Sequence, residues 1–213
     1  MSYDRYAQPV PRYVDHAARR RHMAATAAAL VGTRGLEALT FRNVAEAAGS
    51  STTVLTHYFA DKHDLMLSTY EVVADRHGDR FDAASRAGGG LYKCLETLLP
   101  LDSERQIEWR LLTCYWGMAV SDPRLAEVQA GHVRSAQRRI EVKLRELRAD
   151  APKIEVELVA RRLGTMVHGL GAHHVLDPAY WSPATQRKVL AHEMSCVHTF
   201  PALRDQSAAG AAS

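Results

Sequence analysis

Apolar residues recur at helical spacing along nearly the whole of this 213-residue chain. The alternation of β-branched and polar residues that marks a half-buried strand is almost absent, and Ala, Leu, Arg and Glu dominate. Gly88–Gly90 and Pro100 interrupt the helical pattern. The sequence therefore predicts an all-α fold, with helices over residues 15–33, 41–48, 51–58, 61–87, 91–99, 103–120, 122–149, 154–176 and 182–200.

The composition is that of an ordinary globular protein, with 46% hydrophobic and 24% charged residues. No apolar run is long enough to span a membrane, and residues 1–6 do not resemble a signal peptide. Cys94, Cys114 and Cys196 are widely spaced and form no metal-binding or redox pair, which is typical of reduced thiols. We therefore expect a cytoplasmic protein without a membrane partner.

The net charge of +3 is too small to indicate a polyanionic partner. A local basic cluster is present at Arg19–Arg21, with Arg5 and Arg12 upstream. This cluster fits a nucleic-acid contact and the solvated face of a helix equally well.

The most informative stretch surrounds Gly49, between two short predicted helices. Thr40 is a good N-cap for the first helix, and Ser50 or Ser51 caps the second. Gly49 supplies the backbone conformation of a sharp turn at little steric cost. The second helix exposes short hydroxyl side chains and His57, which can approach bases and phosphates. A pair of helices in an ordinary bundle is the alternative.

The longer string over residues 39–67 resembles the DNA-binding motif of the TetR family of bacterial repressors. The match covers about residues 16–70 and rests on Thr40, Val44, Ala45, Ala48, Gly49, Ser51, Tyr58, Phe59, Lys62 and Leu65. The run over residues 57–62 is weakly similar to the choline-responsive BetI branch. Ser50, Thr53 and Thr56 depart from the family pattern, and Thr56 replaces a tyrosine that typically touches the DNA backbone.

The resemblance implies a homodimer whose two recognition helices enter successive major grooves of a pseudo-palindromic operator. Residues 1–60, with an N-terminal arm over 1–14, would form the three-helix DNA-binding domain, and residues 61–213 the helical ligand-binding and dimerisation domain. A small-molecule effector would release the repressor, although an activator fits the sequence as well. Carried over position by position, the expected DNA contacts are Thr40, Arg42, Ser51, Thr52, Thr53, His57, Tyr58 and Lys62.

The helix predicted over 103–120 is rich in aromatic residues. Trp109, Leu112 and Trp116 lie at i, i+3 and i+7 and share one face. A plain hydrophobic core explains such a stripe, but the corresponding helices of TetR-like proteins wall a ligand cavity. We expect Trp109, Leu112, Tyr115, Trp116 and His168 to bind the effector, and aromatic faces could also hold a quaternary amine.

The segments 154–176 and 183–199 resemble the two helices that form the TetR-family dimer. Gly164, Gly169, Gly171 and Ala172 are small and permit close helix approach. Glycine weakens a helix by about 1 kcal/mol per residue, so a packing or ligand reason is expected. A kink near residues 169–171 is the alternative.

No motif of an enzyme is present, and no cofactor or metal is predicted. Gly169 and Gly171 lack the third glycine and the preceding strand of a dinucleotide-binding loop. His192 and His198 are about 240° apart on a helix and cannot share a zinc ion. His173 and His174 fit surface, interface or pocket positions. The alternative function is a helical ligand-binding or interaction protein without sequence-specific DNA binding.

Overall fold

The computed structural model describes residues 15–199, so the predicted arm over 1–14 and residues 200–213 lie outside the described residues. The described chain is helical and contains no strand, which confirms the predicted all-α fold. The elements are α1 (His16–Arg34), the 3-10 turn η1 (Leu36–Ala38), α2 (Phe41–Ala47), α3 (Thr52–Tyr58), α4 (Lys62–Arg86), α5 (Leu91–Glu96), α6 (Ser103–Ala119), α7 (Pro123–Leu147), α8 (Lys153–Leu176) and α9 (Pro183–Thr199).

Side-chain caps determine where most of these helices begin. In each case a side-chain oxygen of the capping residue accepts a hydrogen bond from a backbone N–H of the first turn, which would otherwise lack a partner. The capping residues are Asp15, Thr40, Ser51, Asp61, Asp102 and Asp122. Because these caps are local, the helix starts could be predicted from the sequence.

Three local features of the helices can be compared with the predicted helix ranges. The turn η1 was not predicted. The helix α5 ends at Glu96 and not at residue 99, because the N–H groups of Leu98 and Leu99 bond to the carbonyls three residues back and no longer to those four residues back. The helix α8 is continuous from Lys153 to Leu176 and includes Gly169 and Gly171.

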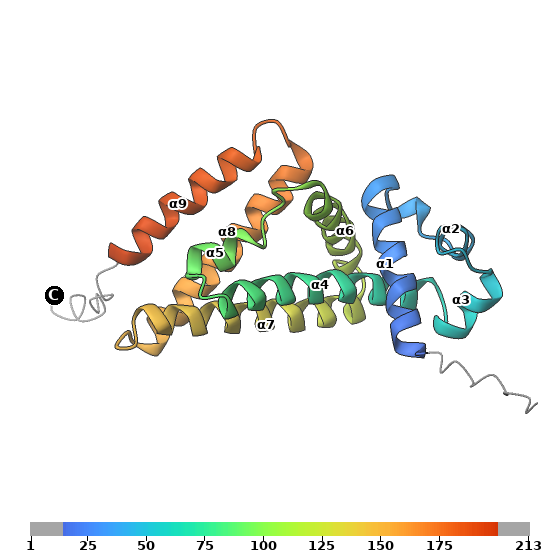
Figure 1. The fold of residues 1–213 in the computed structure, drawn as a ribbon, viewed down its shortest axis with the longest axis horizontal. Coiled ribbons are helices and arrows are strands. Elements are labelled where there is room, and N and C mark those ends of the chain that lie inside the picture. Colours follow the sequence, from blue (N-terminus) through green and yellow to red (C-terminus); the bar gives the residue numbers. More distant parts are fainter. Residues whose placement is uncertain (1–14, 200–213) are drawn as a thin grey trace, which may run out of the picture.

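The two long helices α4 and α7 lie side by side along the larger part of the molecule (Figure 1). The helices α1, α2 and α3 cluster at one end, and α4 leaves this cluster and runs beside α7 toward α5. The helix α1 packs against both α4 and α6. Gly32 of α1 lies so close to Ile107 of α6 that an added Cβ would be 2.3 Å from the Ile107 carbonyl oxygen. The N-terminal cluster is therefore in direct contact with the helices that follow.

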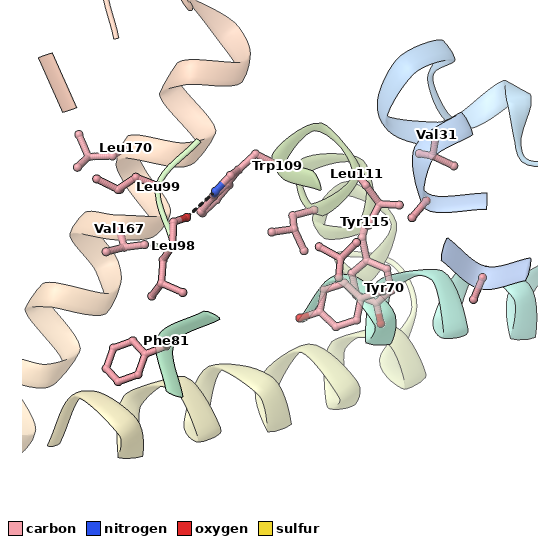
Figure 2. Packing of buried hydrophobic residues seen from close by; sticks show 14 of the residues in the cluster. Val31, Tyr70, Phe81, Leu98, Leu99, Trp109, Leu111, Tyr115, Val167 and Leu170 are labelled. Carbon is pink, nitrogen blue, oxygen red and sulfur yellow. Dashed lines mark hydrogen bonds between the residues drawn. The ribbon is translucent and has the colours of Figure 1, made fainter. Parts of the chain in front are cut away.

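The aromatic residues of α6 form the centre of the larger helical part (Figure 2). Trp109 and Tyr115 are almost completely buried. The Trp109 indole donates to the carbonyl of Leu98 at 2.8 Å, and the Tyr115 hydroxyl donates to the carbonyl of Leu125 at 3.0 Å. Both rings are therefore held in place at their polar ends as well as by packing.

Gly171 of α8 makes room for the Trp109 ring. A Cβ at position 171 would lie 2.3 Å from two carbons of that ring, so the predicted packing reason for a glycine in this helix is present here. None of the helices in residues 15–199 is long and apolar enough to cross a membrane.

Replacing Gly171 with Ala should destabilise the protein despite the better helix propensity of alanine. The gain in propensity is about 1 kcal/mol, whereas forcing a buried ring aside costs about 1–3 kcal/mol. The matched control is Gly117→Ala in α6, where nothing lies within 4 Å of the added Cβ and stability should rise. Chemical unfolding of both variants measures the difference; a Gly171→Ala protein as stable as Gly117→Ala would contradict this packing.

Candidate functional site

The helices α2 and α3 form a tight pair around a glycine turn. Val44 of α2 and Leu55 of α3 are fully buried between the helices, and Phe59 follows α3 into the same core. Gly49 has φ of +60°, a conformation that side chains other than glycine rarely adopt. The turn and the two short helices thus have the form of a helix-turn-helix.

The outer surface of this pair carries the predicted DNA contacts. Seven of them are exposed and Tyr58 is half-buried; they lie at the start of α2, along α3 and at the first residue of α4 (Thr40, Arg42, Ser51, Thr52, Thr53, His57, Tyr58 and Lys62). The hydroxyls of Thr40 and Ser51 accept backbone N–H bonds as caps and keep their own protons available to a phosphate. The Thr56 hydroxyl instead donates to the carbonyl of Thr53 at 2.8 Å.

Arg20 of α1 ties α3 to the start of α4. Its Nη2 donates to Asp64 Oδ1 at 2.7 Å and to Ser68 Oγ at 2.6 Å, both on α4. Its Nη1 donates to the carbonyl of Tyr58, the last residue of α3. The guanidinium also lies 4.5 Å from the centre of the Phe59 ring. One side chain therefore fixes the position of the recognition helix relative to both of its neighbours.

The sequence did not reveal this role of Arg20. The three arginines at positions 19–21 are consecutive in the sequence. They differ in the direction in which each side chain leaves α1. Arg19 and Arg21 are exposed, whereas Arg20 is half-buried and faces α4. An acceptor such as the half-buried Asp64 can be matched to it only when the packing of α1 on α4 is known.

Replacing Arg20 with Met should loosen α3 and lower stability by about 1–3 kcal/mol, because charge-assisted hydrogen bonds to a carboxylate and a carbonyl are lost. The matched control is Arg21→Met, which removes an exposed arginine from the same turn of α1. Thermal unfolding and backbone hydrogen exchange of α3 measure the effect. Equal protection of α3 in the two variants would exclude the proposed anchor.

A cavity of about 90 Å³ lies between α4, α6, α7 and α8. Four of the predicted effector residues line it: Trp109, Leu112, Trp116 and His168. Tyr115 does not line it, contrary to the prediction, because its ring faces Tyr70, with centroids 3.8 Å apart, and its hydroxyl is bound to Leu125. The contributions of α4 and α7 were not predicted; the residues are Tyr70, His77, Phe81, Gln129, His132 and Arg139, among others.

Three rings of the cavity wall pack against one another. Trp109 and Trp116 meet edge to face with centroids 5.8 Å apart. His168 of α8 lies 5.3 Å from Trp116 and 6.2 Å from Trp109, also edge to face. These geometries are those of favourable aromatic pairs, so the rings stabilise one another's positions.

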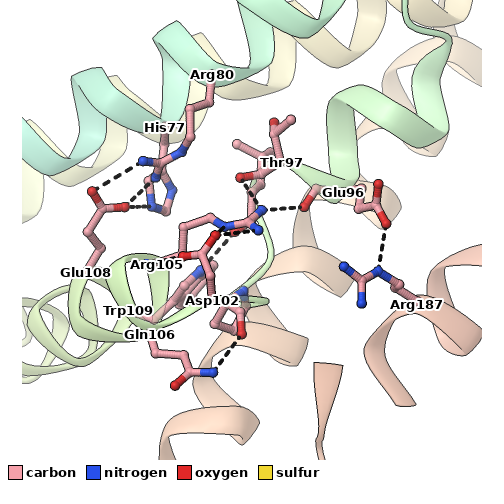
Figure 3. Close-up of polar contacts among 12 residues, drawn as sticks. His77, Arg80, Glu96, Thr97, Asp102, Arg105, Gln106, Glu108, Trp109 and Arg187 are labelled. Carbon is pink, nitrogen blue, oxygen red and sulfur yellow. Dashed lines mark hydrogen bonds and ion pairs between the residues drawn. The ribbon is translucent and has the colours of Figure 1, made fainter. Parts of the chain in front are cut away.

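A buried charge cluster lies beside the cavity on α4 and α6 (Figure 3). Glu108 is 3% exposed and accepts from Arg80, with Arg76 and His77 also within ion-pair distance. Burial alone would raise the pKa of Glu108, but the contacts with His77 and Arg80 outweigh it and lower the pKa to about 2. Glu108 is therefore ionised, and its charge is balanced within the protein.

The two buried histidines of the cavity are uncharged near neutral pH. Burial disfavours the imidazolium of His168 and, with the nearby His77, lowers its pKa to about 4. Burial also lowers the pKa of His77, against the opposing effect of Glu108. The cavity wall therefore gains no positive charge from these two rings.

The low pKa of His168 predicts a pH-dependent stability. The unfolded chain takes up a proton near pH 6.5 and the folded chain only near pH 4, so stability is lost as the pH falls between these values. Replacing His168 with Gln should flatten this dependence by about 1–3 kcal/mol. Denaturant titrations from pH 7 to pH 4 measure the slope; an unchanged slope in His168→Gln would contradict the shift.

Comparison with known protein families fits this arrangement. Residues 24–69 match the bacterial regulatory proteins of the tetR family. Residues 89–195 match the C-terminal domain of BetI-type transcriptional repressors. The chain belongs to the TetR family. Its members are DNA-binding transcriptional regulators and not enzymes, which confirms the prediction that this protein has no catalytic role.

Individual relatives match most of the length of this chain. The HTH-type transcriptional regulator PksA of Bacillus subtilis is 26% identical over 192 residues, which cover 88% of this chain and 94% of PksA. A transcriptional regulator from Rhodococcus sp. Rha1 has a TM-score of 0.74 at 24% identity, covering 84% of this chain and 95% of its own. A regulator from Saccharomonospora viridis, solved in complex with choline, has a TM-score of 0.74 at 19% identity, with coverages of 84% and 96%. The two structures show that the fold is shared.

Proposed function

We propose that this TetR-family regulator is a repressor that binds a pseudo-palindromic operator as a homodimer and leaves it when a small molecule occupies the cavity. The exposed polar face of α3 carries the proposal. Its hydroxyl side chains are short, so the helix can come close enough for them and for His57 to contact base edges. Arg42 and Lys62 add positive charge on either side of these residues. Because the proposed target is operator DNA, we place the protein in the cytoplasm.

We assign reading of DNA to residues 1–60 and dimerisation to α8 and α9, within residues 61–213. The exposed side of α8 carries Leu158, Thr165 and Leu176, with the small residues Gly169 and Ala172 between them. Leu176 is 76% exposed in the single chain, and Leu158 is 44% exposed. A second copy would cover this stripe and bring two α3 helices to one duplex.

The helix α4 offers a physical route from the cavity to the DNA-binding surface. Tyr70 and His77 of α4 line the cavity, and the first turn of α4 holds Asp64, the partner of Arg20. Tyr70 also donates to Gln129 of α7, and His63 lies 2.7 Å from Asp122 at the start of α7. A ligand that separates α4 from α7 would shift α4 and, through Arg20, the recognition helix.

Two substitutions on the α3–α4 surface test this function. Replacing His57 with Ala should relax the preference for the operator over other sequences, because a base contact is lost. Replacing Lys62 with Ala should weaken binding to all sequences and reduce its salt dependence by about one unit of slope, because a phosphate contact is lost. Binding titrations against salt, on operator and on competitor DNA, separate the two effects.

Equal losses on every DNA for both variants would refute the assigned roles. If the wild-type protein shows no preference for any DNA over competitor, the alternative of a helical ligand-binding or interaction protein holds instead. The natural DNA to test first is the region upstream of the protein's own gene, because regulators of this family often bind there.

A further inference from the structure

The helices α4 and α7 lie side by side (Figure 1) and are joined by polar side chains at two levels of the cavity. Toward the DNA-binding end, the Tyr70 hydroxyl of α4 donates to Gln129 Oε1 of α7. Toward the other end, Arg139 Nε of α7 donates to the two carboxylate oxygens of Asp82 of α4, at 3.0 and 3.1 Å. Among residues 15–199, no hydrogen bond or ion pair joins the two helices between these levels. This middle stretch is called the α4–α7 seam.

A hollow lies on each side of the α4–α7 seam. The inner one is the cavity. The outer hollow, of about 380 Å³, is lined by residues of α4 and α7 and includes the exposed Asp75 and Asp79. Three residues line both spaces, namely Ala74, His132 and Arg139. These three side chains therefore form a common wall between the cavity and a hollow on the surface.

The three residues of the common wall differ in how firmly they are held. Arg139 is fixed by its carboxylate partner, and its Nη1 also donates to Ser135 Oγ at 3.1 Å. Ala74 contributes only a methyl group. The half-buried His132 ring meets Tyr70 edge to face, with centroids 5.3 Å apart, and forms no hydrogen bond or ion pair within residues 15–199. His132 is therefore the wall side chain that can change rotamer at the least cost.

Two other borders of the cavity are filled by buried groups. Between α4 and α6, Glu108 is paired with Arg80 and His77 (Figure 3). Between α6 and α8, the Trp109 ring is so close to Gly171 that an added Cβ would lie 2.3 Å from it. A molecule that entered at these borders would have to separate a buried ion pair or displace a buried indole, and both are costly.

We propose that small molecules enter the cavity from the outer hollow, through the α4–α7 seam, and that the His132 ring is the gate. The regulatory meaning of this route rests on the proposed function, in which the cavity is the effector site. An entering molecule passes between α4 and α7, the two helices whose separation would shift the recognition helix. The route and the proposed response to the ligand therefore involve the same pair of helices.

Quenching of tryptophan fluorescence by acrylamide, a small uncharged amide, tests this route in the full chain. Of the three tryptophans, Trp109 and Trp116 line the cavity. Trp181 stacks on His173 and does not line the cavity. All proteins compared carry Trp181→Phe, so that the signal comes from the cavity wall alone. The collisional quenching constant, obtained from fluorescence lifetimes, then measures how readily acrylamide reaches the cavity.

Two substitutions should change the quenching constant in opposite directions. His132→Ala removes the gate and should raise the constant at least about twofold. Gly131→Phe adds a ring at the outer hollow, where nothing lies within 4 Å of an added Cβ, and should lower the constant at least about twofold. The controls are Gly131→Ala, which adds no ring, and Ala126→Phe, which adds one at an exposed position of α7 outside both hollows. Both controls should quench like the Trp181→Phe background, and melting temperatures confirm that each variant is folded.

An unchanged constant in His132→Ala or in Gly131→Phe would overturn the proposal, and so would an equal decrease in Ala126→Phe. Operator binding is measured on the same preparations. Sequence-specific DNA binding with quenching that neither substitution changes would refute the route alone. The expected changes in quenching without preference for any DNA would refute the proposed function alone.

Discussion

The ion pair between Arg20 of α1 and Asp64 of α4 is the contact on which the DNA-binding end depends. The helices α2 and α3 have seven residues each, and helices of that length are not stable alone in water. Packing around Leu55 and Phe59 holds these two helices together. Such apolar packing fixes the distance between helices better than it fixes their orientation. The Arg20 guanidinium adds orientation, because it joins the last carbonyl of α3 to the first turn of α4.

This anchor connects to the rest of the molecule through α4. One helix of 25 residues carries Asp64 at its start and Tyr70, His77 and Phe81 along the cavity wall. The contacts of α1 with α6, at Gly32 and Ile107, form a second connection. A change in cavity occupancy can therefore reach the recognition helix through packed helices alone, provided that α4 has two arrangements of similar free energy.

Features carried by neighbouring residues could be predicted from the sequence, and features that need two distant segments could not. The caps Thr40, Ser51 and Asp61 and the turn at Gly49 revealed the helix-turn-helix. The stripe of Trp109, Leu112 and Trp116 revealed one wall of the cavity. Tyr115 was misplaced and Tyr70 and Arg139 were missed, because which faces of α4 and α7 meet α6 depends on tertiary packing.

Hydroxyl-radical footprinting of the region upstream of the protein's own gene shows whether two copies of α3 bind the duplex together. We expect two protected segments on one face of the duplex, with centres about 10–10.5 base pairs apart or a multiple of that spacing, because two copies of α3 enter successive major grooves. A single protected segment, or uniform protection that competitor DNA abolishes, would contradict it.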